Sequence, residues 1–246
     1  MTQPIALQLY SVREYTEKDF AGTVRKIAAM GYRGVETAGF PGTTPEAAAK
    51  LFNELGLTVV SAHTSLPIGE KKSEVLEQMA AINCKRIVCP SLSPQLFESL
   101  DGLKKAADML NEGSQIAAEH GITVGYHNHD FEFKLIDGEY AYNILRRLVS
   151  PSVFFQVDTY WVTTAGVDVV ALVKDLGKRA PLLHIKDGPC MRNQPMLALG
   201  EGKMDIPAIV QVSRGNAEWL IVELDACATD MLEAVAKSYT YLANLV

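Results

Sequence analysis

The stretch VFFQVDTYWVTTAGVDVVALVKDLGKRAPLLHIKD (153–187) holds two apolar runs separated by a segment with helical spacing. The runs VFFQVD (153–158) and APLLHIKD (180–187) are nearly continuous in apolar residues, as strands covered on both faces are. Between them, DVVALVKDLG (168–177) repeats apolar residues at the spacing of an amphipathic helix and ends on a glycine. A helix between two such strands predicts parallel pairing through a right-handed crossover.

The same strand–helix unit recurs along the whole chain. The other predicted strands are IALQLY (5–10), YRGVE (32–36), LTVVSAH (57–63), RIVCP (86–90), ITVGYHNH (122–129) and EWLIVELD (218–225). Eight such units in 246 residues predict an α/β fold, a (β/α)8 TIM barrel that forms a single domain over residues 1–246. An open doubly wound sheet is the alternative, but no G-x-G-x-x-G follows the first strand.

Composition narrows the class of protein. The chain is 48% hydrophobic and 21% charged, which allows a large core, and its four cysteines form no C-x-x-C. A formal net charge of −6 counts against a protein that grips nucleic-acid phosphates. MTQPIALQLYSV (1–12) lacks the features of a signal peptide, and no apolar stretch approaches the ~20 residues that span a membrane. We therefore expect a cytoplasmic protein with no membrane or nucleic-acid partner. The composition leaves open whether the protein forms a homo-oligomer.

Polar side chains follow most of the predicted strands at their C-terminal ends, where TIM barrels carry their active sites. Glu223 interrupts the apolar run WLIV, and Asp158 and His184 follow FFQV and PLL in the same way. The full set of strand-end residues is Glu36, His63, His127, Asn128, His129, Asp130, Glu132, Asp158, His184, Lys186, Asp187, Glu223 and Asp225. Four of the five histidines of the chain belong to this set.

Two carboxylates and an imidazole from consecutive strand ends would converge, and the carboxylates would repel one another unless a cation lay between them. Oxygen ligands with an imidazole suit Mn²⁺, Mg²⁺, Co²⁺ or Zn²⁺, so we expect one divalent metal ion. The alternative is a structural ion-pair network, and Asp158 alone could instead cap a turn at Thr159-Tyr160.

At these residues the chain resembles the xylose isomerase-like TIM-barrel superfamily of sugar phosphate isomerases and epimerases. That superfamily also includes inosose dehydratase, hydroxypyruvate isomerase, ketose 3-epimerases and endonuclease IV. The resemblance covers nearly the whole chain. The matching motifs are LQLYSVR (7–13), GYRGVE (31–36), SAH (61–63), GYHNHDFEF (125–133), QVDTYW (156–161), LLHIKD (182–187), LGEGKMD (199–205) and IVELD (221–225).

The resemblance implies one metal ion held by Glu, Asp, His and Glu from strands five to eight. Asp158, His184 and Glu223 match that pattern. Many relatives place the first Glu within the fifth strand, where this sequence has Gly125-Tyr126-His127, so Glu132 is the expected fourth ligand, with His129 or Asp130 as alternatives. Trp161 stands where ketose epimerases usually have a substrate-contacting His, and it suggests an apolar stacking wall.

These features lead to a hypothesis of mechanism. A metal ion that chelates a carbonyl and a hydroxyl oxygen of a keto-sugar acidifies the α-proton, and proton removal and return through an enediolate gives epimerisation or isomerisation. We expect Glu132 and Glu223 to be the acid/base pair. Candidate substrate contacts are Glu36, His63, His127, His129, Trp161 and Lys186. For Lys186 the alternative is a rim charge with its head in water. LGEGKMD (199–205) is either a wall of the pocket or a plain turn.

Three competing functions remain on the sequence alone. A dehydratase acting on inosose or dehydroshikimate would start from the same enediolate but lose a β-hydroxyl. An endonuclease IV-like protein would need several zinc ions and a basic face, against which five histidines and the acidic charge count. A non-catalytic sugar-binding barrel would fit the displaced Glu of the fifth strand. No glycine-rich phosphate cradle is evident, which favours a neutral sugar or keto-sugar. The resemblance implies a role in carbohydrate metabolism.

Overall fold

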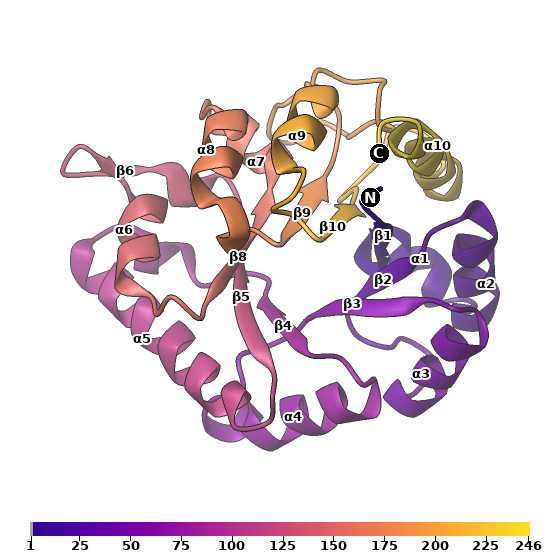
Figure 1. Ribbon diagram of the computed structural model, residues 1–246, viewed down its shortest axis with the longest axis horizontal. Coiled ribbons are helices and arrows are strands. Elements are labelled where there is room, and N and C mark those ends of the chain that lie inside the picture. The colour runs from indigo at the N-terminus through magenta and orange to yellow at the C-terminus, as the bar shows by residue number, and fades with distance from the viewer. Residues whose placement is uncertain (1) are drawn as a thin grey trace.

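The computed structural model describes residues 2–246, and it confirms the predicted (β/α)8 barrel (Figure 1). Eight parallel strands close in the order β1-β10-β9-β8-β5-β4-β3-β2. Their bounds are β1 Ile5–Gln8, β2 Gly34–Thr37, β3 Thr58–His63, β4 Arg86–Cys89, β5 Thr123–His127, β8 Phe154–Asp158, β9 Leu182–Ile185 and β10 Trp219–Val222. Each strand pairs with its neighbours in chain order, and β1 pairs with β10, so helical crossovers alone build the closed sheet.

Helices surround the strands in Figure 1. They are α1 Arg13–Thr16, α2 Phe20–Met30, α3 Pro45–Glu54, α4 Lys72–Ala81, α5 Leu100–Ala118, α6 Ala141–Leu148, α7 Thr159–Thr164, α8 Val169–Leu176, α9 Ile206–Ser213 and α10 Met231–Ala243. Side-chain caps fix where several of them begin. Thr44 caps α3 by accepting a hydrogen bond from the backbone N–H of Ala47, and Pro45 occupies the first position of that helix. Asp168 caps α8 through the N–H of Ala171. No helix among residues 2–246 combines the length and apolar character needed to cross a bilayer.

The barrel interior is layered, because alternate residues of each strand point inward. The lowest layer is apolar and forms a cluster of its own: Ala6, Val60, Val88, Phe154, Leu182 and Ile221. Phe154 fills space that Gly125 leaves free, since a Cβ on Gly125 would meet the Phe154 ring at 2.2 Å. Two residues further along their strands, Gln156 and His184 follow Phe154 and Leu182, and the interior becomes polar. The period of two thus sends polar side chains from several strands toward one end of the barrel.

Several of the predicted strands, the fifth and eighth among them, were too long at their C-terminal ends, where the polar residues lie. The fifth strand ends at His127 and the eighth at Val222, so His129 and Glu223 follow strands rather than belong to them. Between β5 and α6 the chain also forms a 3-10 turn (Phe131–Phe133) and a short hairpin, β6 (Leu135–Ile136) with β7 (Glu139–Tyr140), that the sequence analysis missed.

The glycine-rich loop after β9 is attached to the barrel by one buried carboxylate. Asp187 accepts hydrogen bonds from the backbone N–H groups of Gly188 and Gly200 at 2.8 Å and of Gly202 and Met204 at 3.1 Å. A Cβ on Gly202 would lie 2.1 Å from Asp187 Oδ1, so the glycine is needed for this approach. Asp187 therefore organises the loop and does not face the barrel mouth.

We expect Asp187→Ala to lower the free energy of unfolding by about 3 kcal/mol or more, because four backbone donors lose a buried acceptor. Asp168→Ala is the matched control, since Asp168 accepts one exposed backbone N–H and its loss should cost only about 1 kcal/mol. Urea unfolding of both variants beside the wild type measures the difference. Equal losses in the two variants would show that Asp187 does not hold the loop.

Candidate functional site

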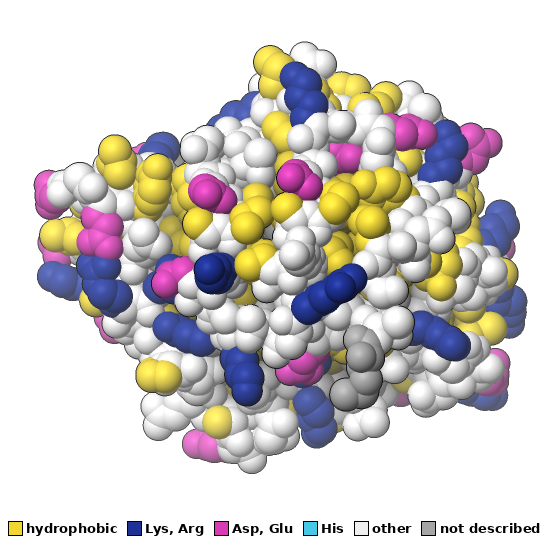
Figure 2. All heavy atoms as spheres, turned by 45° about the horizontal axis from the view of Figure 1, so that its top comes forward, with side chains coloured by type: hydrophobic (Ala, Val, Ile, Leu, Met, Phe, Trp, Pro, Cys, Tyr) yellow, Lys and Arg dark blue, Asp and Glu magenta, His cyan; other side chains and the backbone are white. Residues whose placement is uncertain are grey.

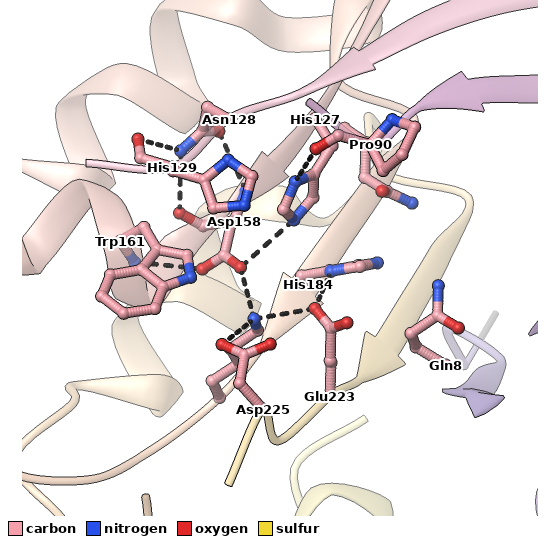
Figure 3. A network of polar contacts seen from close by, with 12 residues as sticks. Gln8, Pro90, His127, Asn128, His129, Asp158, Trp161, His184, Glu223 and Asp225 are labelled. Atoms are coloured by element: carbon pink, nitrogen blue, oxygen red, sulfur yellow. Dashed lines mark hydrogen bonds and ion pairs between the residues drawn. The ribbon is translucent and has the colours of Figure 1, made fainter. Parts of the chain in front are cut away.

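Four buried side chains converge at the C-terminal mouth of the barrel (Figure 3). They are His127 at the end of β5, Asp158 at the end of β8, His184 in β9 and Glu223 just after β10. One ligand atom from each lies within 4.8 Å of the others, which is the spacing of a metal-ligand set. The structure brings three predicted ligands together, and His127 joins them.

The hydrogen bonding of His127 determines which of its nitrogens can bind a cation. Its Nδ1 lies 3.1 Å from the backbone oxygen of Pro90, which can only accept, so Nδ1 carries the proton. Nε2 then turns its lone pair toward Asp158 Oδ2 at 3.3 Å. Burial lowers the pKa of His127 to about 3, so the ring is neutral at physiological pH. A lone pair facing a carboxylate oxygen is the arrangement that a shared cation stabilises.

His184 lies between two carboxylates. Its Nε2 is 2.6 Å from Glu36 Oε1, and its Nδ1 is 2.6 Å from Glu223 Oε2. Burial disfavours the charged ring, but Glu223 and Glu36 outweigh it and raise the pKa of His184 to about 10. The Nδ1–Oε2 contact lacks hydrogen-bond geometry, and both atoms are buried without another hydrogen-bond partner. Glu223 Oε2 is instead held by ion pairs, with His184 and, at 2.8 Å, with the Lys186 ammonium.

Glu36 lies behind the cluster and does not reach the mouth. Its carboxylate is fully buried and accepts hydrogen bonds from Gln8 Nε2 at 2.7 Å, His184 Nε2 at 2.6 Å, Gln156 Nε2 at 2.6 Å and Ser61 Oγ at 2.5 Å. Burial favours the neutral acid, but the neighbouring histidines hold the pKa of Glu36 at about 2. With its acceptor sites filled, Glu36 orients the imidazole of His184, and the expectation of a direct substrate contact has no geometric support.

Lys186 is 1% exposed, so the rim position considered for it is wrong. Its ammonium nitrogen is 2.9 Å from Asp158 Oδ2, 2.8 Å from Glu223 Oε2 and 2.8 Å from Asp225 Oδ2. Burial disfavours its charge, but Asp158 and the other two carboxylates raise the pKa of Lys186 well above its usual range. Figure 3 shows these three carboxylates turned toward one point.

Glu132 lies apart from the four-residue cluster. It is fully buried and accepts hydrogen bonds from Tyr126 Oη at 2.7 Å and from the backbone N–H of His129 at 2.9 Å. His129 Nδ1 is 3.8 Å from the same carboxylate, and Asp130 forms an ion pair with Arg192. The period of two within the fifth strand, which makes His127 its last inward residue, is the signal that would have identified the fourth cluster member.

A cavity of about 520 Å³ opens directly above the cluster. Its lining residues are Tyr10, Ala38, His63, Pro90, Ser91, His127, His129, Trp161, Glu223 and Asp225. His63 and Trp161, two of the candidate substrate contacts, thus line the cavity, and the Lys186 ammonium lies 5.8 Å from the centre of the Trp161 ring. A cavity of about 660 Å³ lies outside the barrel between α6 and α8, but Arg146 and Arg147 there are paired with Asp175 and Glu139. The smaller cavity is therefore the candidate site.

We expect Glu36→Gln to lower the free energy of unfolding by about 3 kcal/mol, because an amide turns a donor toward hydrogen-bond donors inside the barrel. Chelator-treated protein at neutral pH, unfolded in urea, measures this directly. Glu74→Gln, which removes the charge of an exposed carboxylate paired with Lys71, should change little. Identical unfolding curves for Glu36→Gln and wild type would contradict the assigned network.

Solved structures share the fold. A sugar phosphate isomerase/epimerase from Parabacteroides distasonis superposes with a TM-score of 0.82 at 24% identity, over 98% of this chain and 93% of that chain. The probable 3-DHS dehydratase of petrobactin synthesis from Bacillus anthracis gives 0.77 at 14% identity, over 98% and 99%. An L-ribulose 3-epimerase gives 0.75 at 14% identity, over 99% and 94%. No curated relative matches the chain significantly.

At these levels of identity the superpositions show the fold alone. Family membership rests on the sequence model of the xylose isomerase-like TIM barrel, which matches residues 24–241. That match extends from α2 to α10 and includes all four residues of the cluster. The chain therefore belongs to the xylose isomerase-like TIM barrel family.

Proposed function

We propose that this protein is a divalent-metal-dependent isomerase or epimerase of a neutral keto-sugar. The observation that carries the proposal is the convergence of two carboxylates and two imidazoles at the floor of the cavity in the barrel mouth. Pockets that combine an apolar wall with a few convergent polar groups are typical of small-molecule sites, and this end of a TIM barrel is where they lie.

The donor atoms present fit a metal ion. His127 Nε2, Asp158 Oδ2, His184 Nδ1 and Glu223 Oε2 would hold it, with His127 in the place expected for Glu132. His184 Nδ1, which is buried without a hydrogen-bond donor or acceptor partner, supports this set. Two imidazoles with two carboxylates favour Mn²⁺, Co²⁺ or Zn²⁺ over Mg²⁺. A divalent ion there would polarise the substrate carbonyl and acidify the neighbouring C–H bond.

Proton transfer falls to side chains that reach the cavity. The carboxylate of Glu223 is available on the floor. His129 lines the wall, with Nδ1 facing the buried carboxylate of Glu132 and Nε2 left for the substrate. We assign Glu223 and His129 as the acid/base pair, and Glu132 as the residue that orients His129. Return of the proton to the same carbon from the opposite face inverts it, and return to the neighbouring carbon isomerises the sugar.

The cavity lining favours an uncharged substrate. Of the described residues that line it, none is arginine or lysine, while Glu223 and Asp225 are acidic, so the lining offers a phosphate group no guanidinium or ammonium partner. Trp161 and Tyr10 provide flat apolar surfaces, the latter 44% exposed and covered on one face by the Arg13 guanidinium. Figure 2 shows basic and acidic side chains interspersed over the face in view, without the continuous basic surface that is typical of nucleic-acid binding.

The metal is tested by elemental analysis of protein purified without chelator. We expect about one divalent ion per wild-type chain and a large loss in Asp158→Asn, because a neutral amide is a poor ligand for these ions. Asp168→Asn is a matched control: both aspartates cap a helix through Oδ1 at 3.0 Å, which asparagine can replace, but only Asp158 belongs to the cluster. Equal metal contents in the two variants would contradict the ligand assignment.

The reaction is tested by incubating candidate keto-sugars in D₂O. We expect deuterium at the carbon next to the carbonyl, and a rate about 10²-fold or more lower in Glu223→Gln, since a positioned acid or base contributes that much. Full exchange by Glu223→Gln would remove Glu223 from the mechanism. An absorbing enone product would identify a dehydratase, and sugar binding without exchange would identify a non-catalytic barrel.

A further inference from the structure

The Lys186 ammonium occupies the place between the carboxylates where a metal ion is expected. It contacts Asp158 Oδ2 at 2.9 Å and Glu223 Oε2 at 2.8 Å. These are the same oxygen atoms that face His127 Nε2 at 3.3 Å and His184 Nδ1 at 2.6 Å. The ammonium and a divalent ion therefore need the same two oxygens.

Both cations cannot hold those oxygens at once. A divalent ion binds carboxylate oxygen at about 2.0–2.2 Å, which would leave a lysine in its present position within a few ångströms of a double positive charge. Lys186 is 1% exposed, so little water screens that repulsion. Entry of the ion requires the ammonium to move.

Asp225 gives the ammonium another carboxylate. The contact with Asp225 Oδ2 at 2.8 Å has hydrogen-bond geometry, whereas those with Asp158 and Glu223 are ion pairs. Asp225 is not a member of the cluster, and its side chain is 34% exposed in the wall of the cavity. An ammonium that keeps only this bond would leave the cluster and turn toward the cavity.

We propose that Lys186 is an intramolecular competitor of the metal ion: it neutralises Asp158 and Glu223 in the metal-free protein, and Asp225 retains it when an ion takes those oxygens. The inference rests on the metal site of the proposed function. It predicts that removal of Lys186 tightens metal binding and that removal of the Asp225 charge weakens it. A lysine that merely contacts substrate would leave the metal affinity unchanged.

The test is a double-mutant cycle on Mn²⁺ binding to chelator-stripped protein, with free Mn²⁺ measured by electron paramagnetic resonance. Lys186→Met should bind Mn²⁺ at least about tenfold more tightly, because a buried positive charge beside the ion is removed. Asp225→Asn should weaken Mn²⁺ binding in the wild-type background. The same substitution should cause a much smaller loss of affinity in the Lys186→Met background. Lys237→Met removes an exposed lysine paired with Glu201 and should bind as wild type does.

The melting temperature provides a second readout. Without metal, Lys186→Met leaves buried carboxylates uncompensated, so its melting temperature should fall below that of wild type and recover more on addition of Mn²⁺. If Lys186→Met can be purified only with Mn²⁺, its release of the ion into excess chelator should be slower than that of wild type, and faster release would overturn the proposal.

The outcomes separate the two proposals. If the wild type binds Mn²⁺ and Lys186→Met binds it no more tightly, the competition is overturned and the proposed function is unaffected. If Lys186→Met binds Mn²⁺ and the wild type does not, the competition is supported and the proposal that the wild type depends on a metal ion is overturned. Binding by neither overturns both. An Asp225→Asn effect of equal size in both backgrounds shows that Asp225 acts through its charge alone, which overturns its role in retaining the lysine.

Discussion

Two like charges in a space with little water are the constraint on which the rest of this structure depends. Barrel closure brings Asp158 and Glu223 to the same lysine, and both carboxylates are almost fully buried. Such a pair is costly to bury unless positive charge lies close by. Lys186 and His184 supply that charge, each within 2.9 Å of at least one carboxylate oxygen. The geometry of the mouth follows from this balance.

The support for that balance extends down into the barrel. Glu36 holds His184 from behind, and Gln8, Ser61 and Gln156 fill the remaining acceptor sites of Glu36. Below this polar layer the interior is apolar and closely packed, as the contact between Gly125 and the Phe154 ring shows. A site supported by strand residues is held more rigidly than one built on loops, which suits a ligand set that tolerates little displacement.

Much of the fold could be predicted from sequence, because each βα unit carries a local signal. Apolar runs, helical spacing and caps such as Thr44-Pro45 are readable without knowledge of the rest of the chain. Asp158, His184 and Glu223 could be placed at the barrel mouth because they follow apolar strands directly, and the structure puts them together there.

Other features depend on distances through space that no local pattern encodes. Glu132 is only five residues beyond His127, but the turn at Phe131–Phe133 folds it back onto Tyr126 and away from the cluster. Lys186 could be predicted only as a substrate contact or a rim charge, because its three partners come from two other strand ends. Asp187, its neighbour, bonds to backbone groups up to 17 residues later. For Lys186 and Asp187 the partner determines the role, and the partner is remote in the sequence.

The hydrogen bonds of Glu36 also bear on how the chain folds. Its partners Ser61 and Gln8 belong to the first quarter of the chain, whereas Gln156 and His184 are 120 and 148 residues away. A nascent N-terminal half contains the carboxylate and only part of its partners, so that half would keep Glu36 hydrated or protonated until β8 and β9 dock. Closing the barrel and neutralising its interior are thus one cooperative event of high contact order, which should make an isolated half-barrel open and prone to aggregation.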